Sequence, residues 1–515
     1  MRSILIIQTI ILFTLGSCSK ERIPFLPQFS EIDYLIKNGT IVDGTGRPSY
    51  LADIVVVGDQ IVYIGEEDFS YDDSKVRIKN NIDAKGKIVS PGFIDLHSHG
   101  DPLKYPHMQN FLAMGVTTMT LGMDGSSPEI NPLSLWMEEI DKQGIGPNLA
   151  MLIGHGSLRN LSGIGVKKNP TKEELEKMLS ILNESLKYTF GLSTGLEYSP
   201  GLNAESHELR NLAKVVGENN RLIMSHMRNE DDDHIEDSIA ELLEQGEYAR
   251  VHISHLKSVY GKGIDRAEEI LNILNSARDS GIDVTAEIYP YNASYTGIGI
   301  VFPIWSKTQE EFNKVKLSKR EELESYLVNR INQRNGPEST LFGTAPYTGK
   351  TLADLSHEKE MNFEDILIDE IGPNGASGAY FVMNEELQDR LLLDPNIGIC
   401  SDGSISGYHP RGHGTFAKII EKYVVNEGML SLEEAIRKMT SFAAKVLGID
   451  DRGILREGMK ADIIIFNPDK VRARASYTDP FLLAEGFDIV MVNGRKAWDN
   501  QKHSDQLWGK VLKPN

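Results

Sequence analysis

Cysteine and basic charge are both scarce in this chain of 515 residues. Only two cysteines are present, Cys18 and Cys400, so disulfide bonds contribute little to its stability. A chain of this length can bury enough apolar surface to be stable without them. Lys and Arg number 54 against 74 Asp and Glu, which gives a net charge of −20. Because a nucleic-acid-binding protein needs a basic face, this balance argues against a nucleic-acid partner.

Long hydrophobic runs are also missing, apart from a stretch from Ile4 to Leu15 that follows Arg2. It is too short for a comfortable membrane span, and it resembles a secretory signal. The residues Leu-Gly-Ser-Cys18 resemble a bacterial lipobox, in which the cysteine becomes the lipidated first residue of the mature chain. We therefore expect a signal peptide over 1–17 and a tether over 18–30. This predicts an exported bacterial lipoprotein in the cell envelope or periplasm, held to a membrane by its lipid anchor. The alternative is an ordinary signal peptide with an incidental cysteine.

Short alternating strands with turns occur at both ends of the remaining chain. They run from Ile32 to Ile88 and return near Gly458 and Asp488. Asn38-Gly39 is a hairpin turn signal within the first of these regions. We expect a small β-sandwich domain formed from both chain ends, with residues 31–88 and 450–515 as its two parts.

The middle of the chain, residues 89–449, alternates apolar strands with amphipathic helical stretches. The strand candidates are 88–97, 117–124, 148–155, 189–196, 221–228, 250–257, 283–291 and 397–403. Eight strands alternating with helices predict an α/β fold, specifically a (β/α)8 TIM-like barrel. The long gap between strands 7 and 8 contains a charged helical stretch, 307–333, and a second unit near 363–369. We interpret about 292–396 as an insertion over the barrel mouth, where loops carry function.

Polar side chains collect at the ends of the predicted barrel strands, where barrel enzymes place their chemistry. His97 and His99 are two residues apart on one strand, so both imidazoles can face one ion. The other candidate ligands, each at a different strand end, are Asp124, His226, His255 and Asp402. Each alone has an ordinary structural explanation, as a turn carboxylate or a hydrogen-bonded core histidine. Together, these nitrogen and oxygen donors predict a site for zinc or another divalent first-row ion.

Several longer motifs surround these candidate ligands. They are Pro91-Gly-Phe-Ile-Asp-Leu-His-Ser-His, Gly195-Leu-Glu-Tyr-Ser-Pro-Gly, Ser225-His-Met-Arg-Asn-Glu, Ile253-Ser-His-Leu-Lys, Tyr289-Pro-Tyr, Ser401-Asp-Gly and His409-Pro-Arg-Gly-His-Gly-Thr-Phe. With these motifs the chain resembles the N-acyl-D-amino-acid deacylase (D-aminoacylase) family of the amidohydrolase superfamily, from about residue 32 to about residue 498.

The resemblance implies one or two divalent ions, with zinc expected. One position would use the first-strand histidine pair and Asp402, and the other would use His226 and His255. In this family a cysteine at the end of the second strand completes the tighter position, whereas this chain has Asp124 there. A carboxylate is a harder ligand than a thiolate, so this departure bears on ion number and preference. The fourth strand has no lysine, which disfavours the carboxylated-lysine pattern of hydantoinases and dihydroorotases.

The same resemblance implies roles in catalysis. Tyr198 would polarise the scissile carbonyl, and Asp402 would carry a proton from water to the leaving nitrogen. Lys257 and Arg411 would hold the substrate carboxylate, and Tyr289 would also contribute to substrate binding. The expected reaction is hydrolysis of an N-acyl-D-amino acid, a small-molecule substrate, to a carboxylate and a free D-amino acid. The alternatives are a hydrolase of cyclic amides or D-amino-acid-containing dipeptides, and a catalytically inactive lipid-anchored binding protein.

Overall fold

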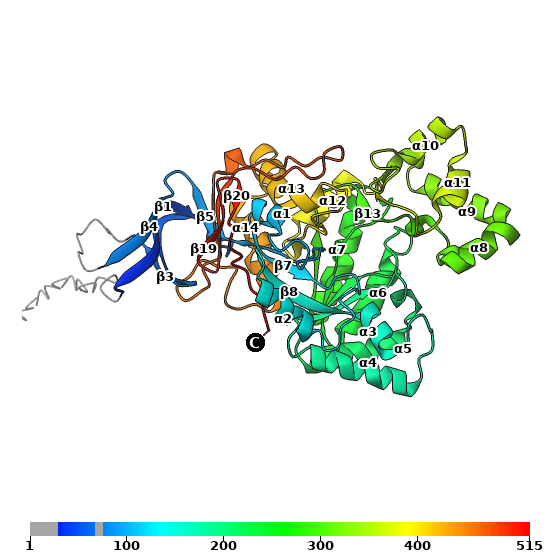
Figure 1. The fold of residues 1–515 in the computed structure, drawn as a ribbon, viewed down its shortest axis with the longest axis horizontal. Coiled ribbons are helices and arrows are strands. Elements are labelled where there is room, and N and C mark those ends of the chain that lie inside the picture. The colour runs from blue at the N-terminus through cyan, green and yellow to red at the C-terminus, as the bar shows by residue number, and fades with distance from the viewer. Residues whose placement is uncertain (1–28, 67–75, 515) are drawn as a thin grey trace, which may run out of the picture.

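The computed structural model describes residues 29–66 and 76–514, which form a barrel with a sheet at one end and a lobe at the other (Figure 1). The predicted signal peptide and the predicted lipidation site Cys18 lie outside these residues. Within the described part, no helix is long and apolar enough to cross a membrane.

Eight parallel strands make the barrel, in the spatial order of the chain. They are β6 (Phe93–Asp95), β7 (Val116–Leu121), β8 (Asn148–Gly154), β9 (Gly191–Gly195), β10 (Leu222–His226), β11 (Arg250–Ile253), β12 (Val284–Ile288) and β16 (Ile397–Ile399). The segments that follow β6 and β16 meet at the mouth, where Ser98 and Gly403 form a parallel bridge. The predicted (β/α)8 barrel is confirmed.

Helices alternate with the barrel strands, as the sequence pattern predicts. The main ones are α2 (Ser134–Gln143), α4 (Lys172–Ser185), α5 (Ser206–Glu218), α6 (Ile235–Gly246), α7 (Gly263–Asp279), α12 (Glu385–Leu393) and α14 (Leu432–Met439). Helix α4 begins at a capping box, in which the side chains of Thr171 and Glu174 each bond the other's backbone N–H. Helix α5 turns Leu209, Leu212 and Val216 into the core, so its apolar stripe seals the outside of the barrel strands.

The prediction of one strand over 88–97 is wrong, because two strands belonging to different sheets occupy it. Strand β5 (Ile88–Pro91) pairs with the end sheet, and β6 begins the barrel after Gly92. A Cβ at Gly92 would lie 2.1 Å from the side-chain oxygen of Thr117. The missing side chain therefore lets the chain pass from one sheet to the other against β7.

Both ends of the chain build the end sheet, as predicted. Its strands are β1 (Glu31–Ile41), β2 (Tyr50–Val57), β3 (Gln60–Gly65), β4 (Arg77–Asp83), β5, β17 (Ile463–Phe466), β18 (Phe487–Val492), β19 (Arg495–Asp499) and β20 (Lys502–His503). Strand β5 joins the two halves, because it pairs with β1 on one side and β17 on the other. The nine-stranded sheet also folds back on itself, so that Gln60 bridges Lys460. The hairpin turn predicted at Asn38-Gly39 is wrong, because β1 continues through both residues with a bulge before Gly39.

A lobe separates β12 from β16 and projects from the barrel at the right of Figure 1. Its elements are β13 (Ser294–Gly297), α8 (Gln309–Ser318), α9 (Arg320–Gln333), β14 (Thr340–Phe342), α10 (Leu352–Lys359), α11 (Phe363–Ile366) and β15 (Ser377–Tyr380). The single charged helical stretch expected over 307–333 is therefore two helices. Strand β15 lies between β13 and β14 in a small antiparallel sheet.

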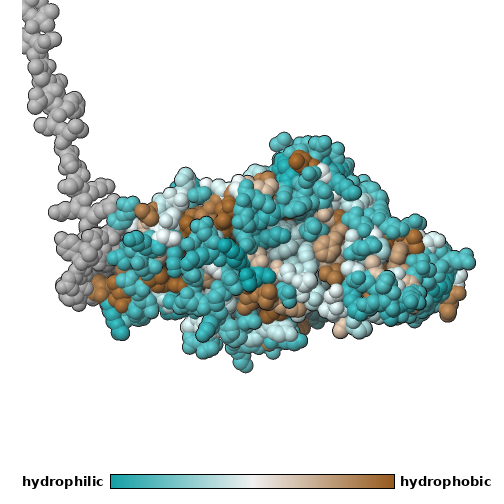
Figure 2. Space-filling view, turned by 90° about the horizontal axis from the view of Figure 1, so that it is seen from above, coloured by the Kyte–Doolittle hydropathy of each residue, from teal (hydrophilic) through white to brown (hydrophobic). Residues whose placement is uncertain are grey.

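One apolar core runs from the inside of the barrel into the lobe. It includes Leu152 and Met224 from barrel strands together with Phe312 and Leu323 from lobe helices. Cys400, also in this cluster, is completely buried, so its thiol packs as part of the core. On the face shown in Figure 2, hydrophilic side chains dominate and apolar ones form separate small patches.

Buried polar side chains join the end sheet to the barrel. Asp462 accepts hydrogen bonds from the Arg452 guanidinium at 2.5 Å, from the Asn148 side chain at 3.1 Å and from the backbone N–H of Asn493 at 2.7 Å. The Asn493 amide in turn donates to the Asn148 side-chain oxygen at 2.7 Å. Since Asn148 begins β8, this network fixes the sheet against the bottom of the barrel.

We therefore expect Asp462→Ala to lower the free energy of unfolding by about 3 kcal/mol, because it leaves the Arg452 guanidinium buried without its main partner. Urea unfolding followed by circular dichroism measures the change. The matched control is Asp469→Ala, at an exposed position nearby, which should alter stability by no more than about 0.5 kcal/mol. Equal unfolding midpoints for the two variants would contradict a role for this network.

Candidate metal centre and active site

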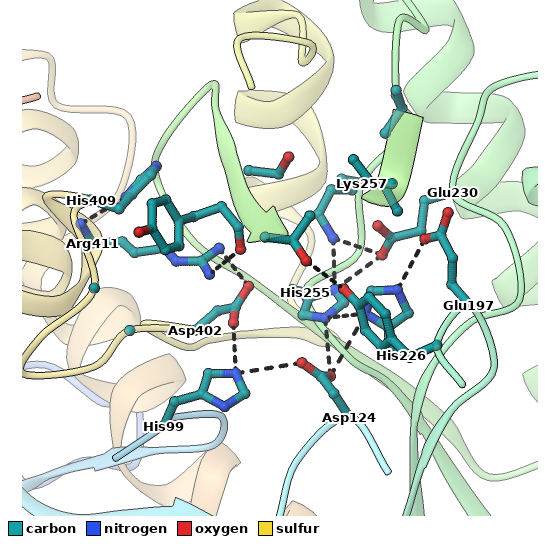
Figure 3. Close-up of a pocket in the computed structure, with 18 of the residues that line it drawn as sticks. His99, Asp124, Glu197, His226, Glu230, His255, Lys257, Asp402, His409 and Arg411 are labelled. Carbon is teal, nitrogen blue, oxygen red and sulfur yellow. Dashed lines mark hydrogen bonds and ion pairs between the residues drawn. The ribbon is translucent and has the colours of Figure 1, made fainter. Parts of the chain in front are cut away.

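The six predicted metal ligands come together at the carboxyl-terminal mouth of the barrel. Their ligand atoms fall into two groups, and within each group they lie within 4.8 Å of one another. The first group is His97, His99, Asp124 and Asp402, and the second is Asp124, His226 and His255. Figure 3 shows five of them pointing toward a common space, namely His99, Asp124, His226, His255 and Asp402. His226 is the last residue of β10, whereas the others follow the ends of their strands.

Three of the ligands adopt the left-handed backbone region, which is unusual for side chains other than glycine. The φ angles are +52° at Asp124, +34° at His255 and +47° at Asp402. Each of these residues lies just past a strand end, where the turn directs its side chain into the mouth. Such conformations cost of order 1–3 kcal/mol each and persist where the surrounding structure enforces them.

Asp124 lies at the centre of the site. Its Oδ1 is 3.4 Å from Nε2 of His97 and 3.4 Å from Nε2 of His255, and its Oδ2 is 3.4 Å from Nε2 of His99. His226 Nδ1 is 3.7 Å from Oδ1. The carboxylate thus faces both groups of ligands at once and is the member they share. This arrangement of imidazole and carboxylate donors, without a thiolate, fits one or two divalent first-row ions.

A buried carboxylate, Glu287 on β12, orients the first histidine. Its Oε1 is 2.9 Å from Nδ1 of His97, and its Oε2 is 3.2 Å from Nε2 of His252. Burial alone would raise the pKa of Glu287, but the two histidines lower it to about 2, so the carboxylate is ionised. It holds the His97 ring with Nε2 toward the centre, the usual arrangement behind a metal-binding imidazole. Sequence reasoning missed Glu287, although it shares strand parity with Tyr289.

Two further carboxylates orient the other histidines, and sequence reasoning assigned a role to neither. Glu197 Oε2 is 3.2 Å from Nε2 of His226, and Glu230 Oε1 is 3.1 Å from Nδ1 of His255. Both belong to motifs that indicated the family, Gly195-Leu-Glu and Ser225-His-Met-Arg-Asn-Glu. In each case the opposite ring nitrogen is left facing Asp124, which completes a metal-binding orientation.

Lys257 and Arg411, the two predicted carboxylate-binding cations, both line the cavity beside the ligands. Lys257 Nζ donates to Glu230 at 2.6 Å and lies 2.7 Å from Nδ1 of His255. Arg411 Nη1 donates to Asp402 Oδ2 at 2.6 Å. Each cation is therefore held in place by a carboxylate, with its charge at the cavity wall.

Asp402 is the carboxylate best placed to move a proton. Its Oδ1 lies 3.1 Å from Nε2 of His99, opposite the oxygen that Arg411 binds. Burial alone would raise the pKa of Asp402, but Arg411 and then His255 and His99 hold it below the ordinary value. The side chain is thus an ionised acceptor at the edge of the cavity.

Tyr198 stands over the second group of ligands. Its ring centroid is 4.5 Å from that of His226, and its hydroxyl is 3.4 Å from Oγ1 of Thr296 in the lobe. Burial, and then the charges of Asp124 and Glu197, raise the pKa of Tyr198 well above 10.0. The hydroxyl therefore stays protonated and can donate a hydrogen bond into the cavity.

Tyr289 does not line the cavity, although sequence reasoning placed it among the substrate-binding residues. Its side chain is 1% exposed, and its hydroxyl has no hydrogen-bond partner within residues 29–66 and 76–514. The Arg411 guanidinium lies 5.0 Å from its ring centroid. The structure thus places Tyr289 behind Arg411, where the ring supports the guanidinium.

The cavity at the mouth has a volume of about 280 Å³. The barrel supplies its polar floor, and the lobe supplies wall residues that include Thr296, Ile300 and Arg334. It combines a cluster of candidate metal ligands, an ionised acceptor and a protonated hydroxyl in one cavity. These are the groups needed to hydrolyse a carbonyl compound with metal assistance.

Comparisons with known proteins agree with this geometry. The model of the amidohydrolase family matches residues 354–496. An N-acyl-D-aspartate deacylase from Alcaligenes xylosoxydans xylosoxydans is 29% identical, over 94% of this chain and 96% of its own.

Two solved structures are similar over most of the chain. The N-acyl-D-glutamate deacylase of Bordetella bronchiseptica, complexed with zinc and a phosphonate inhibitor, has a TM-score of 0.80 at 29% identity and covers 94% of this chain and 100% of its own. A D-aminoacylase with a binuclear metal centre has a TM-score of 0.79 at 28% identity, with the same coverage. The resemblance indicated by the motifs is therefore confirmed: over almost its whole length, this chain is a homologue of N-acyl-D-amino-acid deacylases.

Proposed function

We propose that the protein hydrolyses the amide bond of N-acyl-D-amino acids and releases a carboxylate and a free D-amino acid. The observation that carries this proposal is the set of groups around Asp124. Two groups of metal ligands share that carboxylate, and Asp402 and Tyr198 line the same cavity. The homologous deacylases act on N-acyl-D-aspartate and N-acyl-D-glutamate, which supports the stereochemistry and the linear amide.

A divalent ion held by the histidines, Asp124 and Asp402 would supply Lewis acidity and make water acidic enough to lose a proton near neutral pH. Asp402 accepts that proton on its carboxylate and later delivers it to the leaving nitrogen. The Tyr198 hydroxyl donates a hydrogen bond to the carbonyl oxygen as negative charge develops there. Lys257 and Arg411 hold the α-carboxylate of the substrate by charge and hydrogen bonding.

We also propose that the protein is anchored in a membrane by a lipid on Cys18 and works outside the cytoplasm. The lipobox-like residues before Cys18 and the preceding apolar stretch support this. The anchor would leave the barrel, more than sixty residues further along the chain, free in the aqueous phase.

The reaction is tested by measuring amine release from matched N-acetyl-D- and N-acetyl-L-amino acids with the metal-loaded protein. We expect turnover of the D series only. Asp402→Asn should reduce kcat by at least about 100-fold, because the proton acceptor is lost, while circular dichroism remains that of the wild type. Asp479→Asn, at an exposed position, should retain full activity. Turnover of hydantoins or D-dipeptides in place of N-acetyl-D-amino acids would overturn the assignment.

Because Asp124 faces both groups of predicted ligands, substituting it should change the metal content of the protein. We expect the wild type to hold up to two ions per chain and Asp124→Ala to lose at least one of them, because the carboxylate serves both ligand groups. Asp124→Cys should retain zinc, since a thiolate is a soft ligand that zinc prefers. Elemental analysis after dialysis measures the ions without reference to activity.

The control for metal content is Asp237→Ala, at an exposed position on α6, which should hold as many ions as the wild type. An ion present at about 100 times its dissociation constant stabilises the fold by about 2.7 kcal/mol. Adding a chelator should therefore lower the Tm of the wild type more than that of Asp124→Ala. Unchanged metal content in Asp124→Ala would rule out a shared ligand.

The anchor is tested by expressing the full chain in a bacterium supplied with a radiolabelled fatty acid. We expect the wild type to incorporate label and to sediment with membranes. Cys18→Ser should do neither. Cys400→Ser provides the matched cysteine control and should be labelled like the wild type. A labelled Cys18→Ser variant, or an unlabelled wild type, would refute the lipid anchor.

A further inference from the structure

Arg334 is a buried cation in the cavity wall that the proposed mechanism does not use. It directly follows α9 in the lobe, and its side chain is 5% exposed. Among the described residues, the guanidinium makes one hydrogen bond or ion pair, and this contact is long: 3.4 Å from Nη1 to Asp231 Oδ1. Its Nε is buried and has no hydrogen-bond partner in the described part of the chain. A guanidinium carries five N–H donors, so most of the donors of Arg334 are unused.

The carboxylates around Arg334 are already engaged elsewhere. Both oxygens of Asp231 bind the guanidinium of Arg330, one of them at 3.2 Å. Glu230 binds Lys257, and Glu197 binds the ring of His226. On the other side of the cavity, the charge of Arg411 is matched by Asp402. Among the described residues that line the cavity, Arg334 is thus the cation whose charge is least balanced by neighbouring carboxylates.

Leaving a guanidinium buried with unused donors is costly, and an incoming anion would remove that cost. The aromatic ring of Tyr380, 5.6 Å from the Arg334 Cζ, packs beside the guanidinium but offers no hydrogen-bond acceptor in that contact. A planar guanidinium matches a carboxylate with two parallel hydrogen bonds. The unused N–H donors of Arg334 can therefore bind a carboxylate that enters the cavity.

We infer that Arg334 binds a second carboxylate of the substrate, distinct from the α-carboxylate held by Lys257 and Arg411. This inference rests on the proposed function, and it makes the preferred substrate a dianionic N-acyl-D-amino acid. The second carboxylate belongs either to the amino-acid side chain, as in an N-acyl-D-glutamate, or to the acyl group. The barrel supplies the α-carboxylate contacts, whereas the lobe supplies Arg334, so the two anions are bound by different parts of the chain.

The test compares kcat/KM for two isosteric substrates, N-acetyl-D-glutamate and N-acetyl-D-glutamine, in the wild type and in Arg334→Gln. We expect the wild type to prefer the glutamate derivative by about 10- to 100-fold, the value of a charge-assisted hydrogen bond. Arg334→Gln should remove this preference through a higher KM, while the glutamine derivative changes by less than about twofold. Arg334→Lys should restore part of it, because charge returns without the planar fork.

A second pair, N-succinyl-D-leucine and N-acetyl-D-leucine, places the extra carboxylate on the acyl group. A preference that depends on Arg334 in this pair alone would assign the second anion to the acyl side. Arg390→Gln serves as the matched control, since Arg390 pairs with Glu268 outside the cavity. It should leave all four substrates unaffected.

An equal loss of activity toward all four substrates in Arg334→Gln would overturn the inference and give Arg334 a purely structural role. A wild type that shows no preference within either pair would also overturn it. If the wild type cleaves none of the four, the proposed function fails. Calorimetric binding then tests Arg334 separately: N-acetyl-D-glutamate must bind the wild type at least about 10-fold more tightly than Arg334→Gln, or the second anion site is absent.

Discussion

Two backbone hydrogen bonds at the closure of the barrel determine the geometry on which the metal centre depends. The N–H of Asp402 donates to the carbonyl of His97, and the N–H of His99 donates to the carbonyl of Gly403, each at 2.8 Å. They join the segments after the first and last barrel strands, which are about three hundred residues apart in the chain. The proton acceptor is thereby fixed beside the first histidine pair by main-chain contacts.

Buried carboxylates reinforce this junction from below. Asp95 accepts hydrogen bonds from the Ser401 backbone N–H at 2.9 Å and from the Ser401 hydroxyl at 2.5 Å. Burial raises the pKa of Asp95 to about 7 despite those bonds. Glu287 orients His97 from the same side. The predicted ligands therefore rest on a layer of completely buried polar side chains, which orients them toward one another.

The sequence predicts the barrel and the six ligands because strand ends, strand parity and histidine spacing are local patterns. His97 and His99 illustrate this, since two residues of separation along one strand already place both rings on one side. The division of residues 88–97 between two sheets could not be predicted, because it depends on Gly92 fitting against Thr117 from another strand. Glu287 was missed for a related reason: an acidic residue inside an apolar strand acquires its role only through His97, which lies 190 positions earlier. The place of Arg334 in the cavity could not be predicted either, because Arg334 directly follows a lobe helix whose distance from the mouth is set by tertiary packing alone.

The origin of the cavity walls has a consequence for how such a site can diversify. All six predicted metal ligands, including the proposed proton acceptor Asp402, belong to the barrel, whereas Ile300 and Arg334 enter from a lobe inserted between its last two strands. The lobe has its own small sheet, which pairs with no barrel strand. Substitutions, insertions or exchange of this segment can therefore alter which acyl amino acid fits while leaving the hydrolytic apparatus intact. In this molecule, the lobe residues that shape the cavity and the barrel residues proposed to carry out hydrolysis lie on separate stretches of the chain.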